Sequence, residues 1–227
     1  IWIKVHPKLP IVTTMVNGVP TVQLWKFDVT GQREKLTELS GCSKVNSGAV
    51  LAANWSQDGK YLAAAGWPSA TISGRVYRFA DGTLSELSGS QLTHNNQRLY
   101  GLEWHPNGNY LAYSGYTENE GVDVNLHVGT FDGSDLTNLS GCEFVYTGSY
   151  TLDVAWHKNG EYLAVANAGT TDSVKCFRFK DEKLTAISGC NFEHDSAQMS
   201  WVYSVDWHPG GGVLAIGGTS GTGGYSV

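Results

Sequence analysis

Charged residues and long apolar runs are scarce in this chain of 227 residues. Asp, Glu, Lys and Arg make up 16% of it, against about 25% in soluble domains generally. The longest apolar stretches, such as 61–67, are far too short to cross a bilayer, so we expect no membrane span. No basic segment followed by an apolar one opens the chain, so no signal peptide is visible. Since the chain starts at Ile1 and not at Met, we expect that it was processed or truncated.

Basic clusters and catalytic motifs are missing as well. The 15 Lys and Arg residues stand against 21 Asp and Glu, which gives a net charge of −6, and no basic run occurs. We therefore expect no nucleic-acid partner. The sequence has no Gly-x-Ser-x-Gly elbow, no phosphate-binding loop, no His-Glu-x-x-His motif and no EF-hand loop. It therefore indicates no enzyme, no cofactor and no metal site.

The abundant residues are glycine, tryptophan and tyrosine, with 28, 8 and 11 copies, which is typical of strands and turns. An internal repeat explains this composition. Segments such as GLEWHPNGNYLAYSG and DVAWHKNGEYLAVAN recur with spacings of 49, 52 and 51 residues, aligned on Trp55, Trp104, Trp156 and Trp207. A weaker copy, IKVHPKLPIVTT, carries Val5 in the tryptophan position. A second marker of the type LTELSGC has the same period and starts at Leu36, Leu84, Leu136 and Leu184.

Each repeat predicts four short antiparallel strands. The first ends at the tryptophan and is followed by a turn containing Pro or Gly. The second, as in 162–166, is apolar on both faces and is therefore expected to be covered on both faces. The third ends in an aromatic pair, and the fourth alternates like an outer edge strand. Five such units predict an all-β fold, a single β-propeller domain, with blades at approximately 1–47, 48–97, 98–149, 150–200 and 201–227.

The fifth unit is incomplete, because the chain ends within its third strand. We expect a closed five-bladed ring with a three-stranded last blade, and we also expect that the natural protein runs further, to six or seven blades. The bare strand edge of the last blade is a candidate site for assembly with another chain.

The block Trp-x-Pro-x-Gly-x-Tyr-Leu-Ala, followed by an aromatic-rich third strand, resembles the WD40-like repeat family over essentially the whole chain. The Trp-Asp dipeptide of that family is absent, since the corresponding positions read Trp25-Lys26, Tyr77-Arg78 and Phe177-Arg178. The family's buried hydrogen-bond network is therefore not expected in any blade. The resemblance implies that the loops between second and third strands share one face with the loops between successive blades.

These loops are the longest and most varied in the chain, and binding residues concentrate on such loops. The candidate ligand-binding residues of this loop face are Trp67, Tyr116, Glu118, Glu120, Asp172, His194 and Trp201. The alternative is that the aromatic side chains pack on neighbouring blades and that the acids are only solvated. On the inner strands, the position before the tryptophan carries Glu103 and Asp206, a candidate polar pair near the central channel.

Histidines and cysteines recur with the repeat. His6, His105, His157 and His208 occupy one position in four different units, so they cannot share a metal ion and are predicted to be turn residues. Cys42, Cys142 and Cys190 lie in separate blades, too far apart to bridge. Cys176 lies near Cys190 but is expected to be out of register, so no disulfide is predicted.

These observations favour a non-enzymatic scaffold that binds a protein or peptide partner on the loop face. The alternative is a carbohydrate-binding propeller of the lectin type. It is less favoured because Trp67, Tyr116 and Thr170 would make unequal sites in comparable loops. A propeller hydrolase or lactonase that uses acids in the channel is the third hypothesis, and the absent nucleophile and metal signatures weigh against it. The low content of charged residues slightly favours an extracellular location.

Overall fold

A computed structural model describes residues 2–15, 22–30, 33–44, 48–119, 121–146, 150–168, 173–192, 201–219 and 225–226. Every regular element in these ranges is a β-strand, and the strands form four-stranded antiparallel sheets. The chain is a β-propeller, as the repeat predicts. In the described ranges we find no helix of the length and apolarity needed to cross a membrane.

Each of the first four sheets contains four strands that are consecutive in the chain. The first sheet consists of β1 (Trp2–Val5), β2 (Ile11–Met15), β3 (Val22–Thr30) and β4 (Arg33–Glu38). The second consists of β5 (Val50–Trp55), β6 (Tyr61–Ser69), β7 (Ile72–Ala80) and β8 (Thr83–Thr93). The third consists of β9 (Leu99–Trp104), β10 (Tyr110–Gly115), β11 (Leu126–Phe131) and β12 (Leu136–Asn138). The fourth consists of β13 (Tyr150–Trp156), β14 (Tyr162–Ala168), β15 (Val174–Lys180) and β16 (Lys183–Phe192).

The described residues of the last unit form three strands, β17 (Trp201–Trp207), β18 (Leu214–Thr219) and β19 (Tyr225–Ser226). A single pairing of Ala168 with Trp201 connects it to the fourth sheet.

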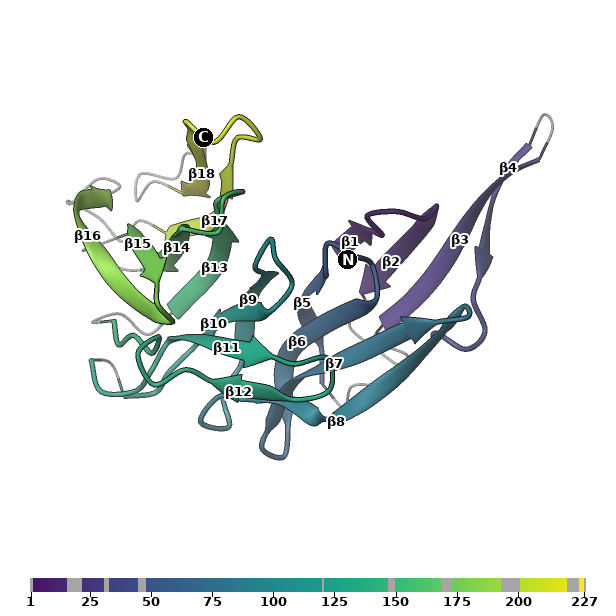
Figure 1. Cartoon of the computed structure of the whole chain (residues 1–227), viewed down its shortest axis with the longest axis horizontal. Helices are drawn as coiled ribbons and strands as arrows, with labels where there is room; N and C mark the ends of the chain where they lie inside the picture. Colours follow the sequence, from purple (N-terminus) through teal and green to yellow (C-terminus); the bar gives the residue numbers. More distant parts are fainter. Residues whose placement is uncertain are drawn as a thin grey trace.

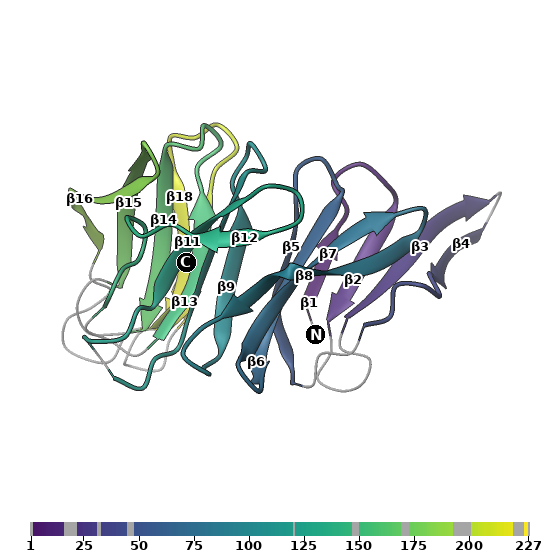
Figure 2. The same cartoon turned by 60° about the horizontal axis from the view of Figure 1, so that its bottom comes forward.

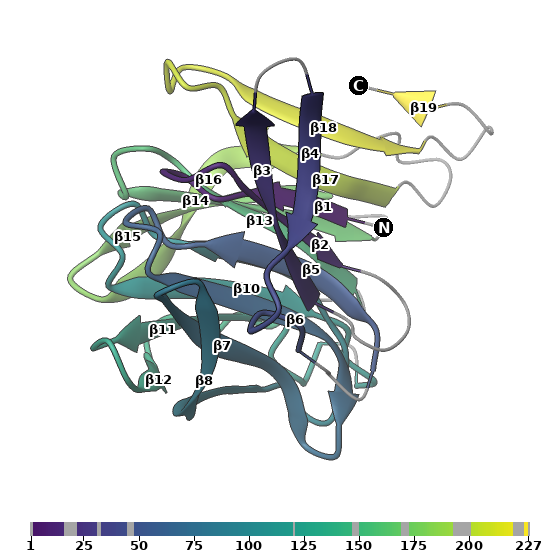
Figure 3. The same cartoon turned by 90° about the vertical axis from the view of Figure 1, so that its right-hand side faces the viewer.

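The five sheets follow one another along an open arc, with β1, β5, β9, β13 and β17 on its inner side (Figures 1 and 2). The outer strands β8 and β12 of the second and third sheets lie close together in the view from the side (Figure 3). The expectation of a closed ring is wrong for the described residues, because β1 and β17 lie at opposite ends of the arc (Figure 1). The side chains of Ile3 and Val5 on β1 are accordingly 61% and 65% exposed.

The hydrophobic core lies between successive sheets. The second strand of each of the middle three sheets is almost fully buried, as in the segment 62–65 of β6 and the segment 163–166 of β14. Side chains of β2 and β3, such as Leu24, pack with Trp55 and Leu62 of the second sheet. Because burying one such side chain contributes about 1.5–3 kcal/mol, these layers supply most of the driving force for stacking the sheets.

The histidines after the tryptophan positions connect one unit to the next. The Nε2 atoms of His6, His105 and His157 lie 2.9, 3.0 and 2.9 Å from the carbonyl oxygens of Gly59, Gly160 and Gly211, each in the turn of a following unit. In His6, Nδ1 accepts hydrogen bonds from two backbone N–H groups, so Nε2 carries the proton and donates. Burial lowers the pKa of His6 and His105, which favours this neutral form. The histidines are turn residues, as predicted, and also inter-unit connectors.

Four inner strands share a β-bulge at one position. The register with the neighbouring strand skips Leu51 in β5, Tyr100 in β9, Leu152 in β13 and Tyr203 in β17. Each of these residues stands four positions before the tryptophan of its repeat. A bulge leaves its extra residue without a cross-strand partner and redirects the side chain.

The prediction that the chain has no disulfide is wrong. Cys176 and Cys190 form a disulfide between β15 and β16, with Cα atoms 5.5 Å apart. The register of this strand pair shifts between Lys175 and Phe177, and that irregularity places Cys176 opposite Cys190. Cys42 and Cys142 are buried free thiols, as expected.

We expect His105→Ala to lower the free energy of unfolding by about 1–3 kcal/mol, because it removes the bond to Gly160 and leaves that carbonyl without its partner. His208 is the matched control, since it is exposed and its Nδ1 only accepts the N–H of Gly210 in its own turn. His208→Ala should stay within about 0.5 kcal/mol of the wild type. Urea unfolding measures both variants, and equal losses would contradict the connector role.

Candidate functional site

A cavity, called here the central pocket, lies on the inner side of the arc. It has a volume of about 410 Å³ and is bounded by residues of all five inner strands and of β2, namely Lys4, Met15, Leu51, Ala52, Ala53, Tyr100, Leu102, Leu152, Asp153, Tyr203 and Ser204. A smaller pocket of about 140 Å³ shares Lys4 with it and also contacts Asn54 and Glu103. Lys4 therefore connects two neighbouring pockets that carry acidic groups.

The four bulge residues all line the central pocket, and we call them the bulge ring: Leu51, Tyr100, Leu152 and Tyr203. The bulges thus turn one side chain of each inner strand from β5 onward toward the cavity. Bulges often aim side chains in this way beside functional sites.

Glu103, near the end of β9, is the carboxyl group of this region whose pKa is raised most. Its Oε2 accepts the backbone N–H of Trp156 on the next inner strand. Burial, with further contributions from Asp153 and Asp206, raises the pKa of Glu103 to about 8, although Lys4 acts in the opposite direction. Glu103 is therefore mostly protonated at neutral pH. Its position resembles that of Asn54 one unit earlier, whose Oδ1 lies 3.4 Å from the backbone N–H of Trp104.

Asp153 is the second carboxyl group of the site. One of its oxygens accepts the Ser204 hydroxyl at 2.8 Å and the backbone N–H of Val205 at 3.1 Å. The other accepts the N–H of Val154 at 3.0 Å. Burial raises the pKa of Asp153, whereas these donors and Lys4 favour its ionised form. Asp153 thus joins two inner strands and faces the central pocket.

The structure brings the predicted channel pair into electrostatic range, since Asp206 is among the charges that raise the pKa of Glu103. Sequence reasoning placed Lys4 at the inner-strand position equivalent to Glu103 without assigning it a role, and it missed Asp153. It considered acids only at the position before each tryptophan, whereas Asp153 follows the bulge at Leu152. The three carboxyl groups come from three different repeats, so no linear motif could reveal them. In the described part of the chain, no group of three or more His, Cys, Asp or Glu side chains could hold a metal ion.

Two of the predicted loop-face residues come together. Tyr116 and Trp201 both pack on Tyr150, with ring centroids 4.8 and 5.4 Å apart. Tyr150 also contacts Tyr100, at 6.1 Å, and Trp201 contacts Tyr203, at 5.9 Å. These contacts connect the loop face to the bulge ring.

The other loop-face residues do not join this aromatic group. Trp67 is 43% exposed and packs under the guanidinium of Arg98, 3.6 Å from its ring centroid. Glu118 is exposed to solvent. Glu120, Asp172 and His194 lie outside the described residues.

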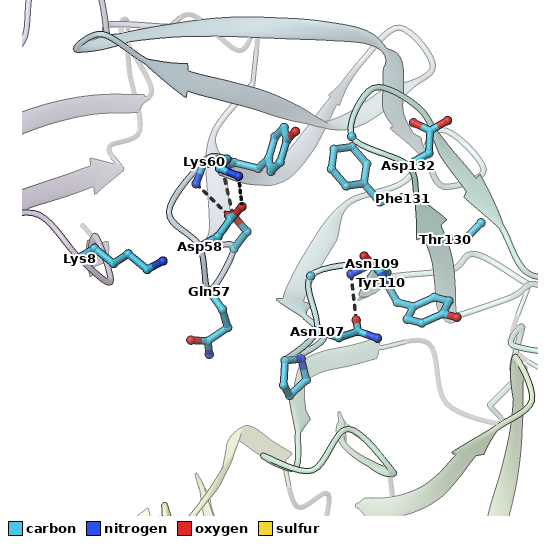
Figure 4. A pocket seen from close by; sticks show the side chains of 15 residues that line it. Lys8, Gln57, Asp58, Lys60, Asn107, Asn109, Tyr110, Thr130, Phe131 and Asp132 are labelled. Atoms are coloured by element: carbon cyan, nitrogen blue, oxygen red, sulfur yellow. Dashed lines mark hydrogen bonds and ion pairs between the residues drawn. The ribbon is translucent and has the colours of Figure 1, made fainter.

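A larger hollow of about 740 Å³ lies among the turns after β5, β9 and β11 (Figure 4). Its polar groups already serve the turns: Asp58 accepts the Ser56 hydroxyl and the backbone N–H of Lys60, and Asn107 accepts the N–H of Asn109. Asp58 also pairs with the Lys60 ammonium at 3.3 Å. The site chemistry therefore concentrates in the central pocket.

Comparison with known proteins supports the fold. No family model matches this chain, and no curated protein matches it. A crystal structure described as a "putative 6-phosphogluconolactonase" from Bacteroides fragilis is similar, with 20% sequence identity and a TM-score of 0.67. The similarity covers 86% of this chain and 55% of that one, so this chain spans about half of the other's length. None of these findings tests the resemblance to WD40-like repeats, which stays a prediction.

This finding corrects two expectations. We expected a non-enzymatic interaction scaffold and no enzyme, and the structural neighbour carries the name of a hydrolase. Glu103 and Asp153 belong to separate repeats, and the folded chain brings them into electrostatic range of each other.

We expect the free energy of unfolding to fall as pH rises from about 5 to about 8. The folded state holds the pKa of Glu103 at about 8, above its ordinary value of 4.5, so the proton stabilises the fold at low pH and this contribution is lost at high pH. Glu103→Gln should reduce this slope, whereas Glu161→Gln, at an exposed turn, should keep it. Urea unfolding across this pH range gives both slopes, and an unchanged slope in Glu103→Gln would refute the shifted pKa.

Proposed function

We propose that this protein hydrolyses a cyclic ester, a lactone, where the central pocket and the smaller pocket adjoin at Lys4. The observation that carries the proposal is that Lys4 lines both pockets, with Asp153 in the central one and Glu103, whose pKa is raised to about 8, in the smaller one. Titratable groups whose environments separate their protonation states are characteristic of acid–base catalysis. Glu103 supplies an acid at neutral pH, and Asp153, held by three hydrogen-bond donors, supplies a base.

Each chemical requirement of lactone hydrolysis has a matching group. Asp153 accepts a proton from the water that attacks the carbonyl carbon. The Lys4 ammonium stabilises the negative charge that develops on the carbonyl oxygen. Glu103 then donates its proton to the ring oxygen as the carbon–oxygen bond breaks, which yields a hydroxy acid. A proton transfer through solvent from Asp153 to Glu103 restores the starting state.

The structural neighbour supports this proposal at the level of reaction class. That protein is described as a putative 6-phosphogluconolactonase, and its fold is similar to that of this chain. At 20% identity the likeness concerns the fold, so the reaction assigned to this chain rests on its own carboxyl groups.

We expect the full chain to hydrolyse lactones faster than buffer alone, as measured by acid release in a weakly buffered indicator assay. The turnover rate should fall as pH rises through about 8, because Glu103 then loses the proton that it donates. Glu103→Gln should lower kcat by about 10²-fold or more, and Lys4→Met by about 10²-fold. The matched control Glu161→Gln should keep the wild-type rate.

No hydrolysis above background by the folded wild type, over a panel of five- and six-membered lactones, would overturn the proposal. A Glu103→Gln variant with full activity would remove Glu103 from the mechanism.

A further inference from the structure

The wall of the central pocket is mainly apolar. The bulge ring provides two leucines and two tyrosines, and Met15, Ala52, Ala53 and Leu102 extend this apolar surface. Its polar lining groups are Lys4, Asp153 and Ser204. A cavity of about 410 Å³ with a few polar groups has the size and character of a site for a small organic molecule.

The charges of the pocket do not suit a phosphate group. Lys4 is the cation among the described residues that line the central pocket, and Asp153 opposes it. Phosphate sites usually combine several Arg or Lys side chains, or backbone N–H groups at a helix N-terminus. The carboxyl group of Asp153 is the acidic group among the described residues that line the same pocket. A phosphate dianion would therefore meet one cation, opposed by a carboxyl group.

Both tyrosines of the bulge ring, Tyr100 and Tyr203, line the central pocket. Tyr203 is 50% exposed, although it lies on an inner strand. Tyr100 is half-buried, and its ring contacts that of Tyr150. Tyrosine rings supply large contact area with little loss of side-chain freedom, and aromatic partners pack against them in offset or edge-on geometry.

From this wall and these charges, we propose that the bulge ring selects an uncharged lactone that carries an aromatic or alkyl group, rather than a phosphorylated sugar lactone. The inference rests on the proposed function for the reacting ester. The binding preference itself depends on the residues that line the pocket, and it can be measured without hydrolysis. The ester would face Lys4 and the carboxyl groups, and the apolar group would contact Leu51, Tyr100, Leu152 and Tyr203.

Binding of a non-hydrolysable analogue tests the preference separately from the reaction. The probe is 3,4-dihydro-2-quinolinone, the lactam that matches the aromatic lactone dihydrocoumarin, titrated into the full chain by calorimetry. We expect it to bind at least about 10-fold more tightly than 6-phosphogluconate. Tyr203→Ser should weaken lactam binding by about 10-fold. Leu36→Ala, at a side chain of similar exposure on the outer strand β4, should leave it unchanged.

The outcomes separate the two proposals. If the lactam binds and Tyr203→Ser weakens it, but no lactone is hydrolysed, the proposed function fails and the binding preference stands. If phosphorylated sugar lactones are hydrolysed with a higher kcat/KM than dihydrocoumarin, the proposed function stands and the preference is overturned. Failure of the folded protein to bind the lactam at millimolar concentration, or equal affinity in Tyr203→Ser, also overturns it.

Discussion

The packing of each inner strand against the next is the interaction on which the rest of this structure depends. It is visible where His6 lies edge-on to Trp55, with ring centroids 4.6 Å apart, and where His105 lies on Trp156 at 4.7 Å. Each of these histidines also bonds the turn of a following unit. The sheets have no shared hydrogen-bond ladder between most units, so these contacts and the apolar layers set the spacing of the inner strands. The second unit carries Ser56 in place of the histidine, and the next tryptophan there packs on Tyr61 instead.

That spacing creates the candidate site. Glu103 reaches the backbone of the fourth unit, and Asp153 reaches that of the fifth, so each carboxyl group is held between two sheets. Burial between sheets is also what raises the pKa of Glu103. The same contacts that hold the sheets together therefore produce an acid that keeps its proton at neutral pH.

The chain uses one scaffold for two separate surfaces. In the turns after the tryptophan residues, polar side chains such as Asp58 and Asn107 accept hydrogen bonds from backbone N–H groups of the same turn. These turns therefore mainly stabilise the units. At the other end of the inner strands, the aromatic residues around Tyr150 connect the loop face to the bulge ring.

Much of the fold of this protein is specified by residue patterns within each repeat. The tryptophan period, the doubly apolar second strand and the turn position of His105 depend on neighbours in the chain, so the sequence alone determined the all-β class and the propeller fold. Tertiary structure decided what depends on register and on the approach of separate repeats. It decided the bulge that aims Tyr203 into the pocket, the meeting of Glu103 with Asp153, the disulfide of Cys176 and the open arc. These features arise from distances between strands far apart in the chain, which no local pattern of residues specifies.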